Sequence, residues 1–183
     1  MNRTMIIEYW KFMPITANHF NSLLWLVKAA SKDETRVNIF QTIHVEQGIC
    51  YCTDGHRLHV YSQDEECLPA DFYITDGNYL IKSVTKKNIV LVEKDPDDLF
   101  PDVNRLLDYI PDRTLNRQFY GDFSSFTFDI FSKLKTLVNI DYLRDAYIPD
   151  EDVSFERPAG REDRSAMLFG NETRLAMIMP LRQ

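Results

Sequence analysis

Three side chains near residue 55 are of the kinds that carry acid–base chemistry. Asp54, His56 and His59 lie close together in the sequence, and a carboxylate beside two imidazoles can transfer protons near neutral pH. The chain contains no Gly-Xaa-Ser-Xaa-Gly, His-Glu-Xaa-Xaa-His, Walker or dinucleotide-binding pattern that would complete an active site. We therefore expect no catalytic residues, and an unrelated hydrolase on a mixed fold is the least favoured interpretation.

Metal and cofactor sites are not expected either. Cys50 and Cys52 are separated by one residue, which is the wrong spacing for a zinc pair and puts both thiols on one face of a strand. Three cysteines without framework spacing fit a reduced cytoplasm. The acidic clusters fall in turn-like stretches, where solvation accounts for them, at residues 65–66, 97–98 and 150–152.

The composition is that of a folded chain with an acidic balance. The 183 residues are 44% hydrophobic and 27% charged, which suffices for a core. A net charge of −7 argues against a broadly basic surface that grips nucleic acid, although it leaves room for a locally basic face. No apolar run is long enough to span a bilayer, and residues 1–8 hold no signal-peptide core, so we expect a cytoplasmic protein.

The candidate acid–base residues sit at a predicted hairpin turn. Residues 49–52 and 59–61 have the β-type pattern of strands. Asp54-Gly55 between them is a strong hairpin signal, because Gly55 accepts a positive φ without a Cβ clash. The turn explains the glycine but leaves the other polar side chains of residues 53–58 without a role.

The first part of the chain predicts a strand, a helix and three strands, followed by more β structure. The predicted strands are residues 7–15, 37–45, 49–53, 57–62 and 71–75, with a later hairpin whose arms are residues 79–84 and 89–94. From residue 17 to residue 31, apolar side chains at helical spacing would bury one helix face on a sheet; they are Phe20, Leu23, Leu24 and Val27.

The opposite face of this predicted helix is polar. Asn21, Lys28 and Lys32 fall on it, with Trp25 between them. A solvated face is the simpler interpretation, and a face turned toward DNA is the sharper one. Thr16 or Asn18 is expected to cap the helix.

The second half of the chain is less regular. Residues 108–118 are polar and are expected to form a connector. Residues 119–135 are rich in aromatic side chains, for which we expect a strand and then a short helix. Residues 138–143 predict a strand that enters a helix capped by Asn139 or Asp141. The last strands are expected at residues 152–156 and 165–169, with a turn at 171–172.

Three segments resemble the bacterial DNA polymerase III β sliding clamp family and occur in the family's order. Residues 53–58 are similar to its Thr-Asp-Gly-His-Arg-Leu signature. Residues 100–102 are similar to its Phe-Pro-Asp element, although Val103 stands where the family usually has an aromatic residue. The third segment is similar to the family's last half-domain and comprises Asn139, Tyr142-Leu143 and Met179-Pro180-Leu181-Arg182.

The resemblance implies an α+β, DNA-clamp-like fold. It would consist of two strand-helix-three-strand halves with mostly antiparallel sheets, two main helices and an extra β-hairpin. We expect a first half with the hairpin extension at residues 1–107, a connector and aromatic-rich segment at 108–135, and a second half at 136–183. Together these parts are expected to form one compact domain.

The resemblance also implies a cleft that binds linear-peptide motifs of replication proteins. The residue types fit, because methionine and aliphatic side chains give an adaptable apolar slot and arginines at its rim can bond peptide groups. The implied peptide-binding residues are Thr53, Gly55, His56, Arg57, Leu58, Pro101, Arg105, Leu106, Met177, Ile178, Met179, Pro180, Leu181 and Arg182. The DNA-facing residues would be Asn21, Lys28 and Lys32.

Two functions follow from the resemblance. The first is a non-enzymatic, sliding-clamp-like protein of DNA replication or repair that docks partner peptides and contacts or encircles double-stranded DNA as an oligomer. The alternative is a phage or mobile-element module that keeps the peptide cleft without forming a ring. The chain is about half as long as the family's three-domain chains, so a closed ring would need several copies, as in a homo-oligomer. Neither interpretation involves a membrane.

Overall fold

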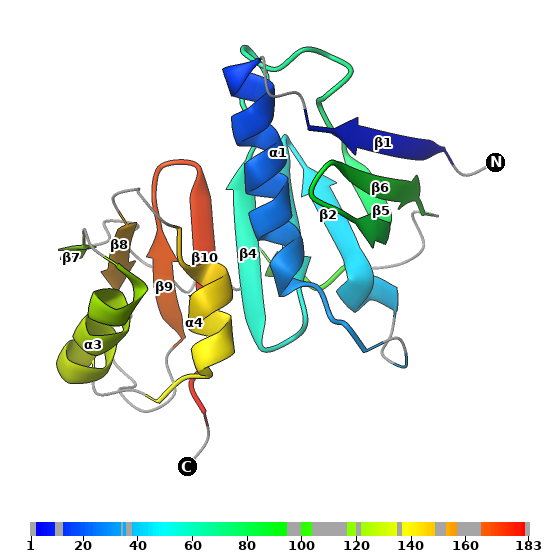
Figure 1. The fold of residues 1–183 in the computed structure, drawn as a ribbon. Coiled ribbons are helices and arrows are strands. Elements are labelled where there is room, and N and C mark those ends of the chain that lie inside the picture. The colour runs from blue at the N-terminus through cyan, green and yellow to red at the C-terminus, as the bar shows by residue number, and fades with distance from the viewer. Residues whose placement is uncertain are drawn as a thin grey trace. The chain divides into compact units, whose positions relative to one another are not determined.

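The protein is described from a computed structural model (Figure 1). The structure describes residues 3–9, 13–33, 35, 38–94, 100–103, 117–119, 122–134, 137–148, 153–156 and 166–181. The chain divides into two compact units. Unit 1 comprises Met1–Gly55 and His59–Phe100, and unit 2 comprises His56–Leu58 and Pro101–Gln183.

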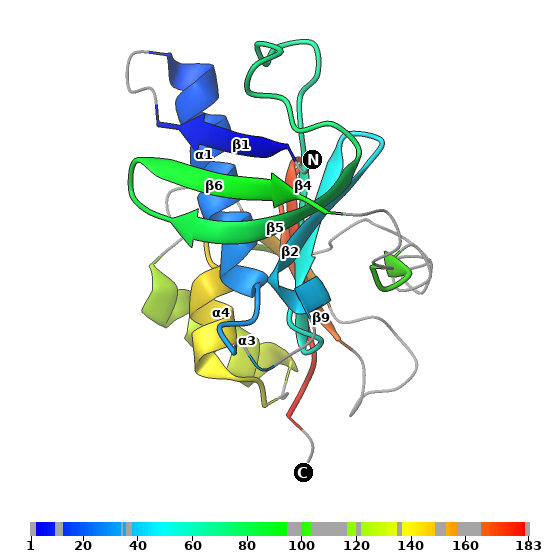
Figure 2. The same cartoon turned by 90° about the vertical axis from the view of Figure 1, so that its right-hand side faces the viewer.

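Unit 1 is built on an antiparallel sheet. Its strands are β1 (Thr4–Glu8), β2 (Thr42–Glu46), β3 (Ile49–Thr53), β4 (Arg57–Ser62, whose first two residues belong to unit 2), β5 (Gly77–Val84) and β6 (Asn88–Glu93). They lie in the order β1-β6-β5-β2-β3-β4, and Figure 2 shows β1, β6 and β5 side by side. The register pairs Ile7 with Ile89 and Ile43 with Tyr79. All four side chains are buried, so these strands supply much of the core of unit 1.

Helix α1 (Pro14–Leu26) crosses one face of this sheet and continues as the 3-10 turn η1 (Val27–Ala29) (Figure 1). The helix predicted from the apolar spacing is confirmed, and Phe20 and Leu23 are buried. The expected cap is wrong, because the helix begins three residues earlier at Pro14, which suits the first helical position. Thr16 donates its hydroxyl to the Met13 carbonyl at 2.9 Å instead of accepting from a helix amide.

The described residues of unit 2 form a four-stranded antiparallel sheet and two helices. Its elements are β7 (Arg117–Phe119), α3 (Phe123–Leu134), α4 (Ile140–Ala146), β8 (Val153–Glu156), β9 (Met167–Gly170) and β10 (Arg174–Ile178). The strands lie in the order β10-β9-β8-β7. Phe126 of α3 packs its ring edge-on against Phe169 of β9, with centroids 5.5 Å apart, and also lies 5.4 Å from the Tyr147 ring. These aromatic contacts fix α3 on the sheet.

The predicted α+β, clamp-like class is confirmed. The order strand, helix and three strands appears in unit 1 as β1, α1, β2, β3 and β4. The strands predicted at residues 49–53 and 57–62 and the hairpin predicted at 79–94 are also confirmed. The described residues contain three α-helices, one more than the two main helices expected. Within this described part of the chain, no helix combines the length and apolarity needed to cross a membrane.

Three predicted strands of the first half differ from the structure. The first strand is residues 4–8 and not 7–15, and residues 38–41 form the 3-10 turn η2 (Asn38–Gln41) before β2 begins. Residues 71–75 form turns and irregular structure. The reason is a contact with a side chain eleven residues earlier: Gln63 both accepts from the Ile74 amide and donates to the Ile74 carbonyl, each at 2.9 Å. These bonds satisfy backbone groups that a strand would have given to a neighbour.

The aromatic-rich segment agrees with the prediction in part. A helix follows a strand as expected, but the strand ends at Phe119 and residues 123–134 are all helical. Asp122 caps the helix by accepting from the Ser125 amide at 2.8 Å, and Phe126 and Ile130 are buried one turn apart. The Asn139 cap is confirmed, since its side chain accepts from the Asp141 amide at 2.9 Å, but no strand precedes α4. The end of the predicted connector is part of strand β7, and its residues 108–116 lie outside the described residues.

Candidate partner-docking surface

The implied peptide-binding residues divide by exposure. The exposed ones are Gly55, His56, Pro101, Met179 and Leu181, and Pro180 is partly exposed. The buried ones are Thr53, Arg57, Leu58, Met177 and Ile178. Arg105, Leu106 and Arg182 lie outside the described residues. A ligand on the surface can therefore touch the first group directly, whereas the second group shapes the surface from below.

Two of the three clamp-like segments meet in unit 2. The Met179 amide donates to the His56 carbonyl at 2.9 Å, which ties the end of strand β10 to the start of β4. Two residues on, the Leu181 amide donates to the Leu137 carbonyl at 2.9 Å. The chain after β10 is thus fixed in an extended path between His56 and the segment that enters α4. Pro101, from the remaining segment, is assigned to the same unit.

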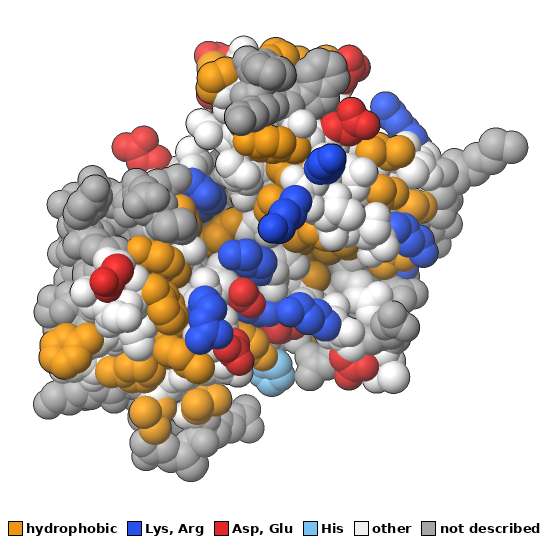
Figure 3. Space-filling view, in the orientation of Figure 1, with side chains coloured by type: hydrophobic (Ala, Val, Ile, Leu, Met, Phe, Trp, Pro, Cys, Tyr) orange, Lys and Arg blue, Asp and Glu red, His pale blue; other side chains and the backbone are white. Residues whose placement is uncertain are grey.

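Four large hydrophobic side chains stay exposed along this path. Met179 is 45% exposed and Leu181 is 52% exposed, and Leu137 and Ile140 beside them are exposed as well. We call these four residues the C-terminal patch. Figure 3 shows hydrophobic side chains gathered around α4 and toward the C-terminus. Neighbouring exposed apolar side chains on one surface are typical of protein or peptide binding sites, whereas single ones are ordinary.

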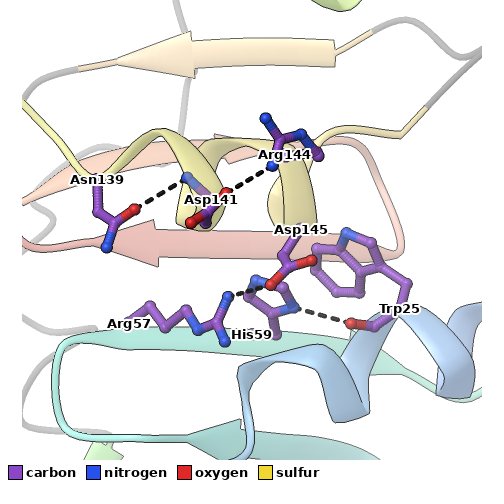
Figure 4. A network of polar contacts seen from close by, with 7 residues as sticks. All are labelled: Trp25, Arg57, His59, Asn139, Asp141, Arg144 and Asp145. Carbon is purple, nitrogen blue, oxygen red and sulfur yellow. Dashed lines mark hydrogen bonds and ion pairs between the residues drawn. The ribbon is translucent and has the colours of Figure 1, made fainter.

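A partly buried ion pair lies in the same unit as this surface. The Arg57 guanidinium bonds the Asp145 carboxylate at 2.6 Å (Figure 4). The Cζ atom of Arg57 also lies 4.4 Å from the centroid of the Tyr142 ring. The Arg57 side chain is 5% exposed, so its charge is balanced inside the unit. The sequence suggested that Arg57 would stand at the rim. In the structure it joins the start of β4 to α4, and Asp145 is a partner that the sequence analysis missed.

Figure 4 also draws three polar side chains of α4 and its N-cap, which are Asn139, Asp141 and Arg144. Asn139 caps the first turn of α4, and Arg144 pairs with Asp141 three residues earlier, both of them well exposed. A solvent-exposed pair of this kind contributes little to stability. The cap and the buried pair, not this outer pair, therefore hold α4 in place.

The candidate acid–base residues differ in their surroundings. His59 is buried in unit 1, where its Nδ1 lies 3.0 Å from the Trp25 carbonyl and its ring stacks on the Trp25 indole at 4.3 Å (Figure 4). Asp54 is buried and His56 is exposed. In the described ranges, no three His, Cys, Asp or Glu residues converge in a way that could hold a metal ion.

The predicted polar face of α1 is partly as expected. Asn21, Lys28 and Lys32 are exposed, but Trp25, which was expected among them, is buried. On the side of α1 that faces the core, His19 lies with its Nδ1 3.0 Å from the Tyr61 hydroxyl. Burial lowers the pKa of His19 to about 4, against a smaller opposing effect of a backbone hydrogen bond at Phe72. The ring is therefore neutral at neutral pH.

Comparison with solved structures shows that the fold is similar to that of bacterial sliding clamps. A Pseudomonas aeruginosa DNA polymerase sliding clamp with ligand is 14% identical, with a TM-score of 0.56 over 98% of this chain and 66% of that one. A Streptococcus pneumoniae DNA polymerase III β chain is 12% identical, with a TM-score of 0.52 over 100% of this chain and 66% of that one. A Bartonella birtlesii sliding clamp bound to griselimycin is 15% identical, with a TM-score of 0.50 over 98% and 66%.

The chain has the sliding-clamp fold, and the structures it resembles are bacterial DNA polymerase III β sliding clamps, as the three sequence segments predicted. It spans 66% of the length of the three clamps compared. No protein-family model matches the sequence, and no curated protein matches it either.

Proposed function

We propose that the chain is a non-enzymatic, sliding-clamp-like scaffold of DNA replication or repair that docks partner peptides on the C-terminal patch. The observation that carries the proposal is the exposure of Met179 and Leu181 beside His56, where two of the clamp-like segments are hydrogen-bonded together. A folded surface seldom leaves neighbouring methionine and leucine side chains in water without a partner to cover them.

The chemistry of the patch suits a linear peptide with apolar anchors. Met179 is unbranched and adapts its shape to different side chains, while Leu181, Leu137 and Ile140 supply fixed apolar area. The path of residues 179–181 is extended, and a second extended chain can lie along it. In this proposal Arg57 and Asp145 act as positioning residues that hold the start of β4 on α4, and do not themselves contact the ligand.

The proposed contact with DNA is supported by fewer residues than the proposed docking of peptides. The exposed face of α1 offers Lys28 and Lys32 to phosphates. Since the chain spans only part of the length of the clamps it resembles, a ring would require several copies. The alternative remains a partner-binding module, encoded by a phage or mobile element, that docks peptides without encircling DNA.

Griselimycin is a suitable probe, because a sliding clamp of the same fold has been solved with it. Calorimetric titration of the full chain should give saturable binding. Met179→Ser with Leu181→Ser should weaken it at least tenfold, because two apolar contacts are lost. Ile6→Ser, an exposed apolar residue of unit 1, is the matched control and should change the affinity less than twofold. Equal weakening by the control, or no binding to the wild-type chain, would refute the docking site.

A separate measurement distinguishes the scaffold from the module. Light scattering should show a homo-oligomer, and that oligomer should be retained on nicked circular duplex DNA at low salt and lost when the DNA is linearised. A monomer at high concentration that binds griselimycin but is never retained on circular DNA would favour the module over the clamp.

A further inference from the structure

A surface of unit 1 shares Lys28 and Lys32 with the proposed DNA contact, and it has further binding features that neither that contact nor the C-terminal patch uses. A cavity of about 760 Å³ opens where the end of α1 and η1 approach the β5–β6 hairpin. Its volume is within the range of pockets that bind small ligands or a few side chains. The floor is apolar and is formed by Leu24, Val27, Ala30, Ile81 and Val84.

The charged residues that line the cavity are all positive. They are Lys28, Lys32 and Lys86, and each is exposed. Among the residues that the structure describes, no Asp or Glu lines it. Figure 3 shows several Lys and Arg side chains over α1 and the β5–β6 hairpin, with hydrophobic side chains between them. In a chain of net charge −7, this is a local reversal of sign next to an apolar hollow.

Hydrogen bonds preform one wall of the cavity. The Ser31 amide donates to the Phe40 carbonyl at 2.7 Å, which ties the end of the helical segment to η2. Gln41 donates its amide to the Asp33 carbonyl at 3.0 Å and closes the same loop. A preformed wall lowers the entropy cost of binding. Val84, at the end of β5, leaves a large part of its side chain in water and is available for a ligand to cover.

We propose that this cavity docks an acidic partner peptide, whose aliphatic side chains enter the apolar floor while its Asp or Glu side chains pair with the three lysines. Charge complementarity and the apolar hollow together select this occupant. A DNA strand has the phosphates but no aliphatic side chains to fill the floor, and the described residues that line the cavity include no aromatic side chain to stack a base. This site is independent of the C-terminal patch.

The test selects the peptide without assuming its sequence. A random dodecapeptide phage library is panned on the immobilised full chain, with an excess of soluble Lys28→Glu/Lys86→Glu chain as competitor. The competitor removes peptides that bind elsewhere, the C-terminal patch included. Surviving peptides should be enriched in Asp and Glu next to Leu, Ile or Val. Survivors without acidic enrichment, or no survivors, would overturn the proposal.

A synthetic copy of the dominant peptide then locates the site by fluorescence anisotropy. Lys28→Glu with Lys86→Glu should weaken binding at least tenfold, and Val84→Ser at least threefold. Lys87→Glu, in the same hairpin turn but outside the cavity lining, is the matched control and should change it less than twofold. Circular dichroism verifies that each variant is folded.

Two other occupants are outcomes of the same experiment. If a 30-base-pair duplex loses affinity for the double variant while the selected peptide does not, the cavity is a nucleic-acid contact and the proposal is wrong. If light scattering shows a dimer that the double variant abolishes and the peptide does not displace, the occupant is a second copy and the proposal is equally wrong. Loss of griselimycin binding bears only on the C-terminal patch.

Discussion

Replacing Asp145 by alanine should destabilise unit 2 far more than an exposed charge on the same helix would. The carboxylate is the ion-pair partner of Arg57, at 2.6 Å, and the Arg57 side chain is 5% exposed. The variant takes the Asp145 carboxylate away from a buried guanidinium, while the contact of Arg57 with the Tyr142 ring remains. A buried positive charge that has lost its partner is costly to keep out of water.

The expected cost can be bounded from the geometry. Removing one member of a fully buried ion pair costs about 3–5 kcal/mol. The Asp145 side chain is 29% exposed, so water can enter the gap and reduce the penalty to about 2–3 kcal/mol. For a chain of this size, each kcal/mol lowers the melting temperature by roughly 2–4 °C. We therefore expect a loss of about 4–12 °C in a calorimetric scan.

Amide hydrogen exchange locates the effect. Residues 140–148 should exchange faster in Asp145→Ala, whereas residues 42–46 of unit 1 should keep their protection. Arg144→Ala, which removes the exposed pair with Asp141, is the matched control and should change the stability by less than about 0.5 kcal/mol. An Asp145→Ala variant no less stable than this control would show that the buried pair does not hold α4, and the reasoning would fail.

Three further predictions concern unit 1. Gly48→Ala should destabilise the chain by about 1–3 kcal/mol in urea unfolding, because Gly48 has φ +74 and a Cβ there would lie 2.7 Å from the Tyr73 hydroxyl oxygen. Burial lowers the pKa of His19 from 6.5 to about 4, so the unfolded chain binds this proton more readily than the folded chain. The free energy of unfolding should therefore be highest above pH 6.5 and fall by about 3 kcal/mol as the pH is lowered from 6.5 to 4. His19→Gln should flatten this dependence of stability on pH, and an unchanged dependence would contradict the prediction. Cys67, which is exposed, should react with Ellman's reagent in the native chain. The other two cysteines are buried and should react only after unfolding. Fast reaction of all three thiols in the native chain would contradict the burial.

The sequence predicts the fold best where local patterns and burial agree. The strands at residues 49–53 and 57–62 are β-rich runs on either side of an Asp-Gly turn, and Gly55 has φ +86 as that turn requires. Asn139 caps α4 because its amide oxygen reaches the amide two residues on. In these places, interactions between residues close together in the sequence determine the structure.

The sequence fails where a distant contact decides the structure. The β-type pattern of residues 71–75 is overridden by the side chain of Gln63. The aromatic residues after 119 suggested a strand, but Asp122 caps a helix whose Phe126 packs on β9. An Asp-Xaa-Xaa-Ser start followed by apolar residues four apart was the missed signal.

The sequence likewise predicted only part of the candidate site. The three clamp-like segments pointed to the part of the chain where His56 and Met179 meet. They did not tell which side chains would face water, because exposure depends on the packing of α4 against β10. Asp145 follows Tyr142 by one helical turn, and that spacing could have paired the acid with Arg57. The cavity beside Lys86 was not predicted, since Lys86 stood in an ordinary hairpin turn and Lys28 and Lys32 on the polar face of the predicted helix.

The most direct test of the docking site follows the methyl groups of the methionines by NMR during a griselimycin titration. The chain has six methionines, and the resonance of Met179, assigned through Met179→Leu, reports the C-terminal patch. Met13, which is also exposed but belongs to unit 1, is the internal control. If peptides dock on the C-terminal patch, the Met179 methyl resonance should shift in step with calorimetric saturation while that of Met13 stays fixed. Saturable binding that leaves Met179 unshifted would contradict it.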